Sequence, residues 1–344
     1  IVNALSIDRL LASFMAERVG GCPREPMVPV TIAVDIATPT TCPEFLTKLV
    51  NAYGEPFGDD SAIPAYTLYE NLKKYGKVFL TGDGADELFG GYKDSKLFLL
   101  QDRLNSLNGA TNIIPNLIHN KLIYSKNSKL RALGHAIIML NKQYDSYNAL
   151  RSGGWNEFMY RCYNSDYKKY SDYFKNIEET EKINFLKLGS SNIERYLNKS
   201  LERLTQQFLV KTDRSSMHNS VEIRSPFLDI KLFKKMCTTS TKSIFKKNEQ
   251  KYILKSILNS KMDCKFTNRK KMGFSPPLKN WLCEYKNQNW AINFLSNKES
   301  LTNKYFNKKS IEKLFVDQNR GYNNTLRIWR LLFLNKWFDE IYIN

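Results

Sequence analysis

The spacing of apolar residues predicts alternating helices and strands over the first eighty positions. Apolar side chains recur at helical intervals in residues 4–19, and a strand is predicted at 28–36. Pro43 suits the first turn of a helix, and a further helix is predicted over 62–75. The short apolar run at 78–80 has the character of a buried parallel strand. This alternation is typical of an α/β fold.

From about residue 95 onward the pattern is almost entirely helical, and an aromatic-rich helix is predicted from Leu326 to Phe338. We therefore predict an α/β architecture in two parts. Residues 1–95 would form a partial parallel sheet with its helices, and residues 96–344 would form a mainly helical remainder.

The stretch from Val78 to Tyr92 carries the most informative chemistry. The predicted strand ends in Thr-Gly-Asp-Gly, so the chain must turn sharply and expose backbone amides there. Three carboxylates, those of Asp83, Asp86 and Glu87, lie in or beside this turn. Ligands of open α/β sheets bind at the carboxyl ends of strands, and clustered carboxylates there suit a hydrated Mg²⁺ that carries phosphates. The alternative is a plain strand-to-helix connection whose acidic residues favour the helix dipole.

Asp213, Ser216 and Ser220 are spaced by three and four, so they would share one face of a helix that runs on from Leu209.

Glu222 and Arg224 would lie where this helix ends, because Pro226 disfavours a helical conformation in the residue before it. Two interpretations stay open. The charged side chains could form a buried network with Asp213 and Arg214, or they could contact a substrate directly.

Two loops offer further candidates. The basic run that ends at Lys271 is followed by Gly273 and two prolines, which predicts a defined loop over 269–281. Such a loop can hold Lys271 over phosphate oxygens, although a solvated basic loop is the alternative. Further upstream, Glu55 is either only part of a turn or a residue that contacts a substrate. Ser61 can cap the helix that follows it.

These blocks resemble those of a known family. The run from Leu80 to Tyr92 closely resembles the acidic signature of the asparagine synthetase family, with Asp83 where relatives often have Glu. Residues 224–229 resemble the family's Arg-x-Pro-Phe-Leu-Asp segment, and Lys271 matches the lysine of its Lys-x-Gly-Phe loop. The Glu55-Pro56 pair resembles the loop that precedes the signature.

The resemblance implies a sheet of the ATP-pyrophosphatase (adenine nucleotide alpha hydrolase-like) type and a carbon–nitrogen ligase activity. In the implied reaction ATP adenylates a carboxylate, pyrophosphate leaves, and glutamine-derived ammonia attacks the acyl-adenylate. Aspartate is the default acceptor, and a glycan or another carboxylate is the alternative. An upstream glutaminase domain or subunit is the implied partner, and a homodimer is left open.

The resemblance also implies roles for single residues. Asp86 would bind Mg²⁺, and Asp83 would lie near the activated intermediate. The backbone at Thr81-Gly82 would line the ATP site, and Lys271 would neutralise charge on the phosphates. Asp213 would border the acyl-substrate pocket as a catalytic candidate. The remaining candidates are substrate contacts: Glu55, Ser61, Glu222 and Arg224.

Two features of the family are absent from the 344 residues, namely the Ser-Gly-Gly-x-Asp-Ser phosphate loop and the catalytic amino-terminal Cys. Both would be expected before Ile1. We therefore expect the chain to be incomplete and to make no asparagine on its own. A non-catalytic relic or scaffold of the same fold is the alternative.

The composition bears on three further properties: membrane segments, the state of the cysteines and nucleic-acid binding. No apolar run approaches twenty residues and no secretory pattern opens the chain, so we expect no membrane segment. The 6 cysteines are scattered, which favours reduced thiols in a cytoplasmic protein. The net charge of +18 comes from lysines spread along the sequence, so nucleic-acid binding is only a minor alternative.

Overall fold

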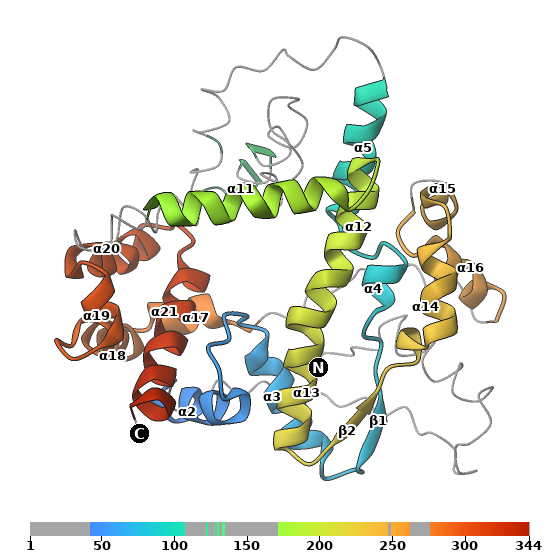
Figure 1. Ribbon diagram of the computed structural model, residues 1–344. Coiled ribbons are helices and arrows are strands. Elements are labelled where there is room, and N and C mark those ends of the chain that lie inside the picture. The colour runs from blue at the N-terminus through green and yellow to red at the C-terminus, as the bar shows by residue number, and fades with distance from the viewer. Residues whose placement is uncertain are drawn as a thin grey trace. The chain divides into compact units, whose positions relative to one another are not determined.

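The computed structural model describes residues 42–106, 122, 127, 129–130, 133–134, 171–246, 249–261 and 276–343 (Figure 1). These residues belong to two compact units whose segments interleave along the chain. The described part of the first unit comes from 61–96 and 196–261, and that of the second from 42–60, 97–195 and 276–343. The predicted division at residue 95 stays a prediction.

The first unit holds both described strands. Its elements are α3 (Ala62–Leu72), β1 (Val78–Leu80), α4 (Ala85–Leu88), the π-helix η1 (Leu204–Phe208), α13 (Leu209–His218), β2 (Glu222–Arg224), the 3₁₀ turn η2 (Pro226–Leu228), α14 (Ile230–Cys237), α15 (Thr241–Ile244) and α16 (Tyr252–Asn259). Two helices have residues in both units: α5 (Ser95–Ser106) and α12 (Asn192–Arg203).

β1 and β2 pair in parallel, and Phe79 lies opposite Ile223 in the register. Both side chains pack against a buried cluster formed by α3 and Val221. Because successive strand residues point to opposite faces, Glu222 and Arg224 lie on the face away from this cluster. The predicted parallel strand at 78–80 is therefore confirmed, but Val78 is 47% exposed, so the strand is not buried as expected.

The helix from Leu209 ends earlier than the sequence suggested. α13 stops at His218, and Ser220 adopts a left-handed conformation with φ +58°. The Val221 amide then donates to the Ser216 carbonyl, which closes the helix end in the position that glycine usually occupies. Ser220 is therefore not on the face of Asp213 and Ser216, and Glu222 and Arg224 form a strand.

Several other predicted elements can be compared with the structure. The helix at Pro43 is confirmed as α2 (Cys42–Tyr53), and the helix predicted over 62–75 is confirmed as α3, three residues shorter. The elements predicted at 4–19 and 28–36 lie outside the described residues. No helix within the described ranges is long and apolar enough to cross a membrane.

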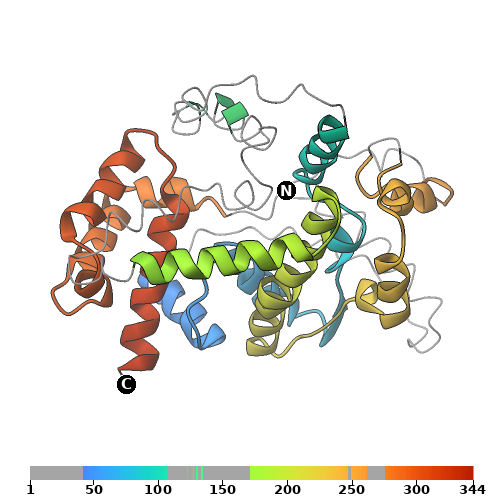
Figure 2. The ribbon, with the colours of Figure 1, turned by 45° about the horizontal axis from the view of Figure 1, so that its top comes forward.

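The second unit is helical in its described part. Its carboxyl-terminal helices gather into one group, drawn in orange and red in Figure 2. The elements are α2, α11 (Ser171–Lys187), α17 (Leu278–Cys283), α18 (Tyr285–Ser296), α19 (Leu301–Tyr305), α20 (Lys308–Asn319), α21 (Thr325–Trp337) and the π-helix η4 (Phe338–Tyr342). α17 corrects one expectation, because the end of the stretch 269–281 is helical rather than a loop.

The aromatic helix predicted from Leu326 to Phe338 is confirmed as α21, and it packs in the core of this unit. Trp329 and Phe333 are almost fully buried, and their rings meet edge to face at 5.8 Å. The Tyr53 ring of α2 also packs against Phe333, with the two ring centres 6.1 Å apart. Its partner Phe57 stacks on Tyr53 at 4.5 Å, so α2 and α21 share one aromatic core.

Two leucines of α21 offer a matched test of this core. Leu332 is 0% exposed and Leu326 is 38% exposed. We expect Leu332→Ala to lower the free energy of unfolding by about 2–5 kcal/mol through lost burial and a residual cavity. Leu326→Ala should change it by less than about 0.5 kcal/mol. Urea unfolding measures both, and equal effects would contradict this description of the core.

Candidate active site

The carboxyl ends of β1 and β2 carry a hydroxyl network around Asp83. The Thr81 hydroxyl donates to Asp83 Oδ2 at 2.9 Å and lies 2.7 Å from the Ser225 hydroxyl. A hydroxyl has one hydrogen, so Ser225 is the donor to Thr81. From α13, the Thr212 hydroxyl donates to the same Asp83 oxygen at 3.2 Å. Two strands and a helix therefore fix the orientation of one carboxylate.

The sharp turn predicted after β1 is present. The Thr81 amide donates to the Arg224 carbonyl at 2.9 Å and extends the pairing of the strands by one residue. The Ala85 amide then donates to the Gly82 carbonyl, and Gly84 adopts φ +88°. A side chain at Gly84 would also meet Leu228 at 2.6 Å, so both backbone and space require glycine there.

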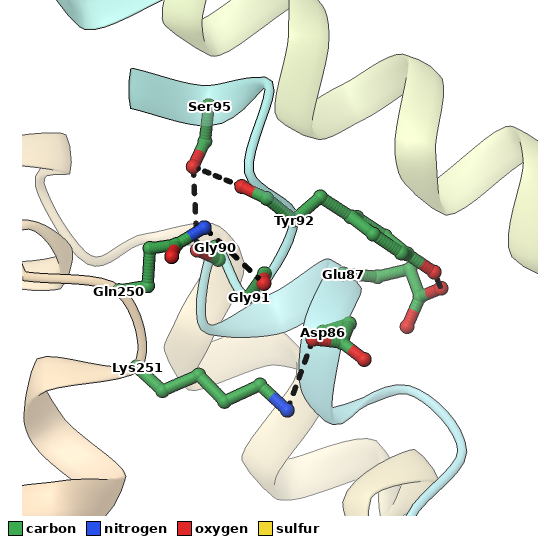
Figure 3. Close-up of polar contacts among 8 residues, drawn as sticks. All are labelled: Asp86, Glu87, Gly90, Gly91, Tyr92, Ser95, Gln250 and Lys251. Carbon is green, nitrogen blue, oxygen red and sulfur yellow. Dashed lines mark hydrogen bonds and ion pairs between the residues drawn. The ribbon is translucent and has the colours of Figure 1, made fainter. Parts of the chain in front are cut away.

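Asp86 forms an ion pair with a lysine that lies far along the chain (Figure 3). The Lys251 ammonium lies 2.9 Å from Asp86 Oδ1, and its side chain is only 9% exposed. Lys251 precedes α16 and has φ +54°, a conformation that non-glycine residues rarely adopt. Its amide donates to the Phe89 carbonyl at 3.1 Å, which anchors the strained residue to the signature.

Gly90 and Gly91 of the signature make room for these contacts. A Cβ atom at Gly91 would overlap the Asp86 carboxylate and the Lys251 side chain, and one at Gly90 would overlap the Phe245 ring. The Gly91 carbonyl also accepts a hydrogen bond from the side-chain NH₂ group of Gln250 at 3.3 Å (Figure 3). The pair therefore lets the segment before α16 approach the backbone of the signature closely.

Glu87 and Tyr92 form a second, more buried pair (Figure 3). The Tyr92 hydroxyl donates a hydrogen bond to the Glu87 carboxylate. Burial raises the pKa of Glu87 above its usual 4.5, although the Tyr92 hydrogen bond opposes that rise. Burial, followed by the charge of Glu87, also raises the pKa of Tyr92. Glu87 therefore serves packing of the signature, in contrast to Asp86, whose side chain is 21% exposed.

Ser61 lies at the position that the sequence predicted, but its side chain does not cap α3. Its hydroxyl accepts instead from the Lys211 ammonium at 2.8 Å. The same ammonium lies 5.1 Å from the centre of the Phe208 ring, which belongs to η1. α3 and α13 are therefore joined by a polar contact beside the site.

Asp213, Glu222 and Arg224 are exposed residues of the first unit. Thr212, beside Asp213, is the residue of α13 that reaches Asp83. Glu222 and Arg224 form an exposed ion pair at 2.7 Å, so the buried charged network considered for them is wrong. Glu55 is exposed in the second unit, and Lys271 lies outside the described residues.

Sequence reasoning missed three residues of this site. Ser225 lies within the segment 224–229 and Thr212 precedes Asp213, but the roles of their hydroxyls follow only from their contacts with Asp83 and Thr81. Lys251 sits in a lysine-rich stretch that reads as a solvated surface. No local pattern in the sequence distinguishes it from its neighbours.

Comparison with known proteins agrees with the motifs. The family model for asparagine synthase matches residues 33–339. The chain belongs to the asparagine synthase family. The resemblance inferred from the acidic signature is therefore confirmed, and it covers both described units.

Two relatives of this chain are asparagine synthetases by name. Asparagine synthetase [glutamine-hydrolyzing] 1 of Bacillus subtilis (strain 168) is 27% identical over 298 residues, which cover 85% of this chain and 45% of the relative. A Mycobacterium tuberculosis (strain H37Rv) protein that bears the asparagine synthetase name is 22% identical over 302 residues, 85% of this chain and 44% of its own. The chain thus spans about half the length of the curated relatives it matches.

Gly91 provides a first test of the site. Gly91→Ala should lower the free energy of unfolding by about 1–3 kcal/mol, because the added methyl displaces the Asp86–Lys251 pair. Gly76→Ala is the matched control, since its Cβ would meet only the Phe79 ring at an ordinary 3.5 Å. Urea unfolding measures the free energy of unfolding of both variants. If that of Gly91→Ala equals the native value, the close approach of the Asp86–Lys251 pair to Gly91 is contradicted.

Glu87 provides a pH test. Its folded-state pKa is raised, so its contribution to stability is full below the unfolded pKa near 4.5 and is lost as pH rises through the folded pKa. We expect Glu87→Gln to become more stable relative to the native sequence as pH rises from about 4 to 8. Tyr92→Phe removes a hydrogen bond to the ionised form, so its stability should fall more steeply over the same range. Urea unfolding at each pH measures the free energy of unfolding of the native protein and both variants. If that free energy depends on pH in the same way for all three, the expectation is contradicted.

Proposed function

We propose that this chain is the synthetase portion of an enzyme that forms an amide from a carboxylate, ATP and ammonia. The carboxylate oxygen attacks the α-phosphorus of ATP and displaces pyrophosphate. Ammonia then attacks the acyl carbon, AMP leaves, and one proton is released. The observation that carries the proposal is the position of Asp83 and Asp86 just beyond the paired strand ends, in a member of the asparagine synthase family.

Asp86 is the residue proposed to bind Mg²⁺. No group of three or more His, Cys, Asp or Glu side chains that could hold a metal occurs within the described residues. Mg²⁺ that accompanies a nucleotide needs only one or two protein carboxylates, because the phosphates supply other ligands. Asp86 is partly exposed and fits that role. When bound, the ion would screen the negative charge of the phosphates.

Lysines would supply the complementary charge. Lys251 already neutralises one oxygen of Asp86 inside the first unit. Lys271, from the loop that matches the family's Lys-x-Gly-Phe motif, is proposed to neutralise charge that develops on the phosphates. The backbone at Thr81-Gly82 is proposed to line the nucleotide site.

Asp83 is proposed to lie near the activated carboxyl group. Its orientation is fixed by the hydroxyls of Thr81 and Thr212, which supports a role that demands a defined geometry. Asp213 remains a catalytic candidate on this proposal. The substrate contacts proposed with it are unchanged: Glu55, Ser61, Glu222 and Arg224.

Aspartate is the proposed acceptor and glutamine the proposed source of ammonia. The name of the Bacillus subtilis relative, a glutamine-hydrolysing asparagine synthetase, supports both. A glutaminase domain or subunit would then be the partner of this chain.

Aspartate-dependent exchange of labelled pyrophosphate into ATP tests the adenylation step. The assay uses this chain joined to the part of the Bacillus subtilis relative that it does not match, after circular dichroism has shown that the fusion folds. We expect exchange that requires Mg²⁺ and aspartate. Asp86→Asn and Lys271→Met should each reduce it by about a hundredfold or more, since each removes a charge that meets the reacting phosphates.

Matched controls on exposed residues keep the result specific. Asp94→Asn and Lys279→Met remove charges of the same kind nearby in sequence, and both should retain nearly full exchange. Exchange that depends on another carboxylate would replace aspartate as the acceptor. A folded fusion that neither binds ATP nor exchanges pyrophosphate would favour a non-catalytic scaffold.

A further inference from the structure

The second unit contains a pocket that the proposed reaction does not use. Its volume is about 240 Å³, and it lies between the end of α18, the turn before α19, and the junction of α21 with η4. At about 30 Å³ for each water-sized group, this space suits a small molecule rather than a single ion. All of its lining residues belong to the second unit.

Asn335 of α21 lines this pocket, and one polar group of its buried side-chain amide has no hydrogen-bond partner among the described residues. Asn335 is 0% exposed, and its Oδ1 accepts from the Thr302 amide at 3.3 Å. A backbone amide can only donate, so the Asn335 oxygen must face Thr302 and its NH₂ group must face the other way. That NH₂ group has no acceptor among the described residues.

A buried donor without a partner has lost its hydrogen bonds to water and gained none in return, so such groups usually have a partner. Asn335 is one of the residues that line the pocket. The first requirement on an occupant is therefore a hydrogen-bond acceptor.

Two carboxylates set the charge of the occupant. Glu299 and Asp339 both line the pocket. Burial raises the pKa of Asp339 even though the Lys336 ammonium opposes that shift. Lys336 itself pairs with Glu340 of η4. Two acids around one cavity attract a cation and repel an occupant that carries its own carboxylate.

The other walls and the backbone agree with a small organic cation. Phe294 and Ile343 supply apolar surface, and the Phe294 ring is held by stacking on Trp290 at 5.3 Å. Asp339 lies in a π-helical turn, a feature that recurs at functional sites.

We propose that this pocket binds a small protonated amine that also carries an uncharged oxygen, such as an amino amide or an amino alcohol. Its ammonium group binds the carboxylates of Glu299 and Asp339, and its oxygen accepts from Asn335. A free α-amino acid fits less well, because its carboxylate would face both acids. The site lies outside the first unit, so it does not depend on the proposed adenylation chemistry.

Isothermal titration of the whole chain with glycinamide tests the proposal. Glycine and acetamide are the comparison probes, because the first adds a carboxylate and the second lacks the ammonium group. We expect saturable binding of one glycinamide, and binding of either comparison probe weaker by about tenfold or more, as expected for loss of one hydrogen bond to a charged group.

Variants locate the binding. Glu299→Gln and Asp339→Asn should each weaken glycinamide binding by about tenfold with the melting temperature kept. Glu312 does not line the pocket and its side chain is 46% exposed, so Glu312→Gln should have no effect. Absent binding at millimolar glycinamide, equal binding of all three probes, or binding insensitive to both pocket variants would each overturn the proposal. The pocket would then hold water only.

Discussion

The parallel pairing of β1 with β2 is the contact on which the candidate active site depends. It is only three residues long, yet it joins positions about 140 residues apart. It brings Thr81 beside Ser225, and it places Asp83 within hydrogen-bonding distance of Thr212 in α13. Because backbone hydrogen bonds set the register, a shift of β1 by one residue would turn Phe79 away from α3 and move Thr81 away from Ser225.

The three carboxylates of the signature have different surroundings although they lie within five residues. Asp83 accepts from neutral hydroxyls, Asp86 faces a lysine ammonium, and Glu87 is buried against a tyrosine hydroxyl. Burial raises the pKa of Glu87. One short acidic run thus supplies an oriented carboxylate, a charge-paired carboxylate and a structural one, which is the kind of division that an active site requires.

Glycine has two separate uses in the same run. Gly84 supplies a left-handed turn, whereas Gly91 lets Lys251 reach Asp86. The strained backbone of Lys251 persists because Phe89 and Gly91 both bond to the segment that carries it. The density of glycine in the signature therefore reflects contact with distant segments as much as local turning.

Local patterns in the sequence were enough to identify the family, the strand at 78–80, the turn after it and the helices α2, α3 and α21. These features depend on residue periodicity and on a contiguous motif, which a linear chain displays. The end of α13 was not predictable, because Ser220 occupies a left-handed position that glycine normally marks. Nor were Thr212, Ser225 and Lys251, whose side chains have ordinary sequence surroundings. Their roles arise from contacts across long stretches of chain, and only the tertiary structure decides those contacts.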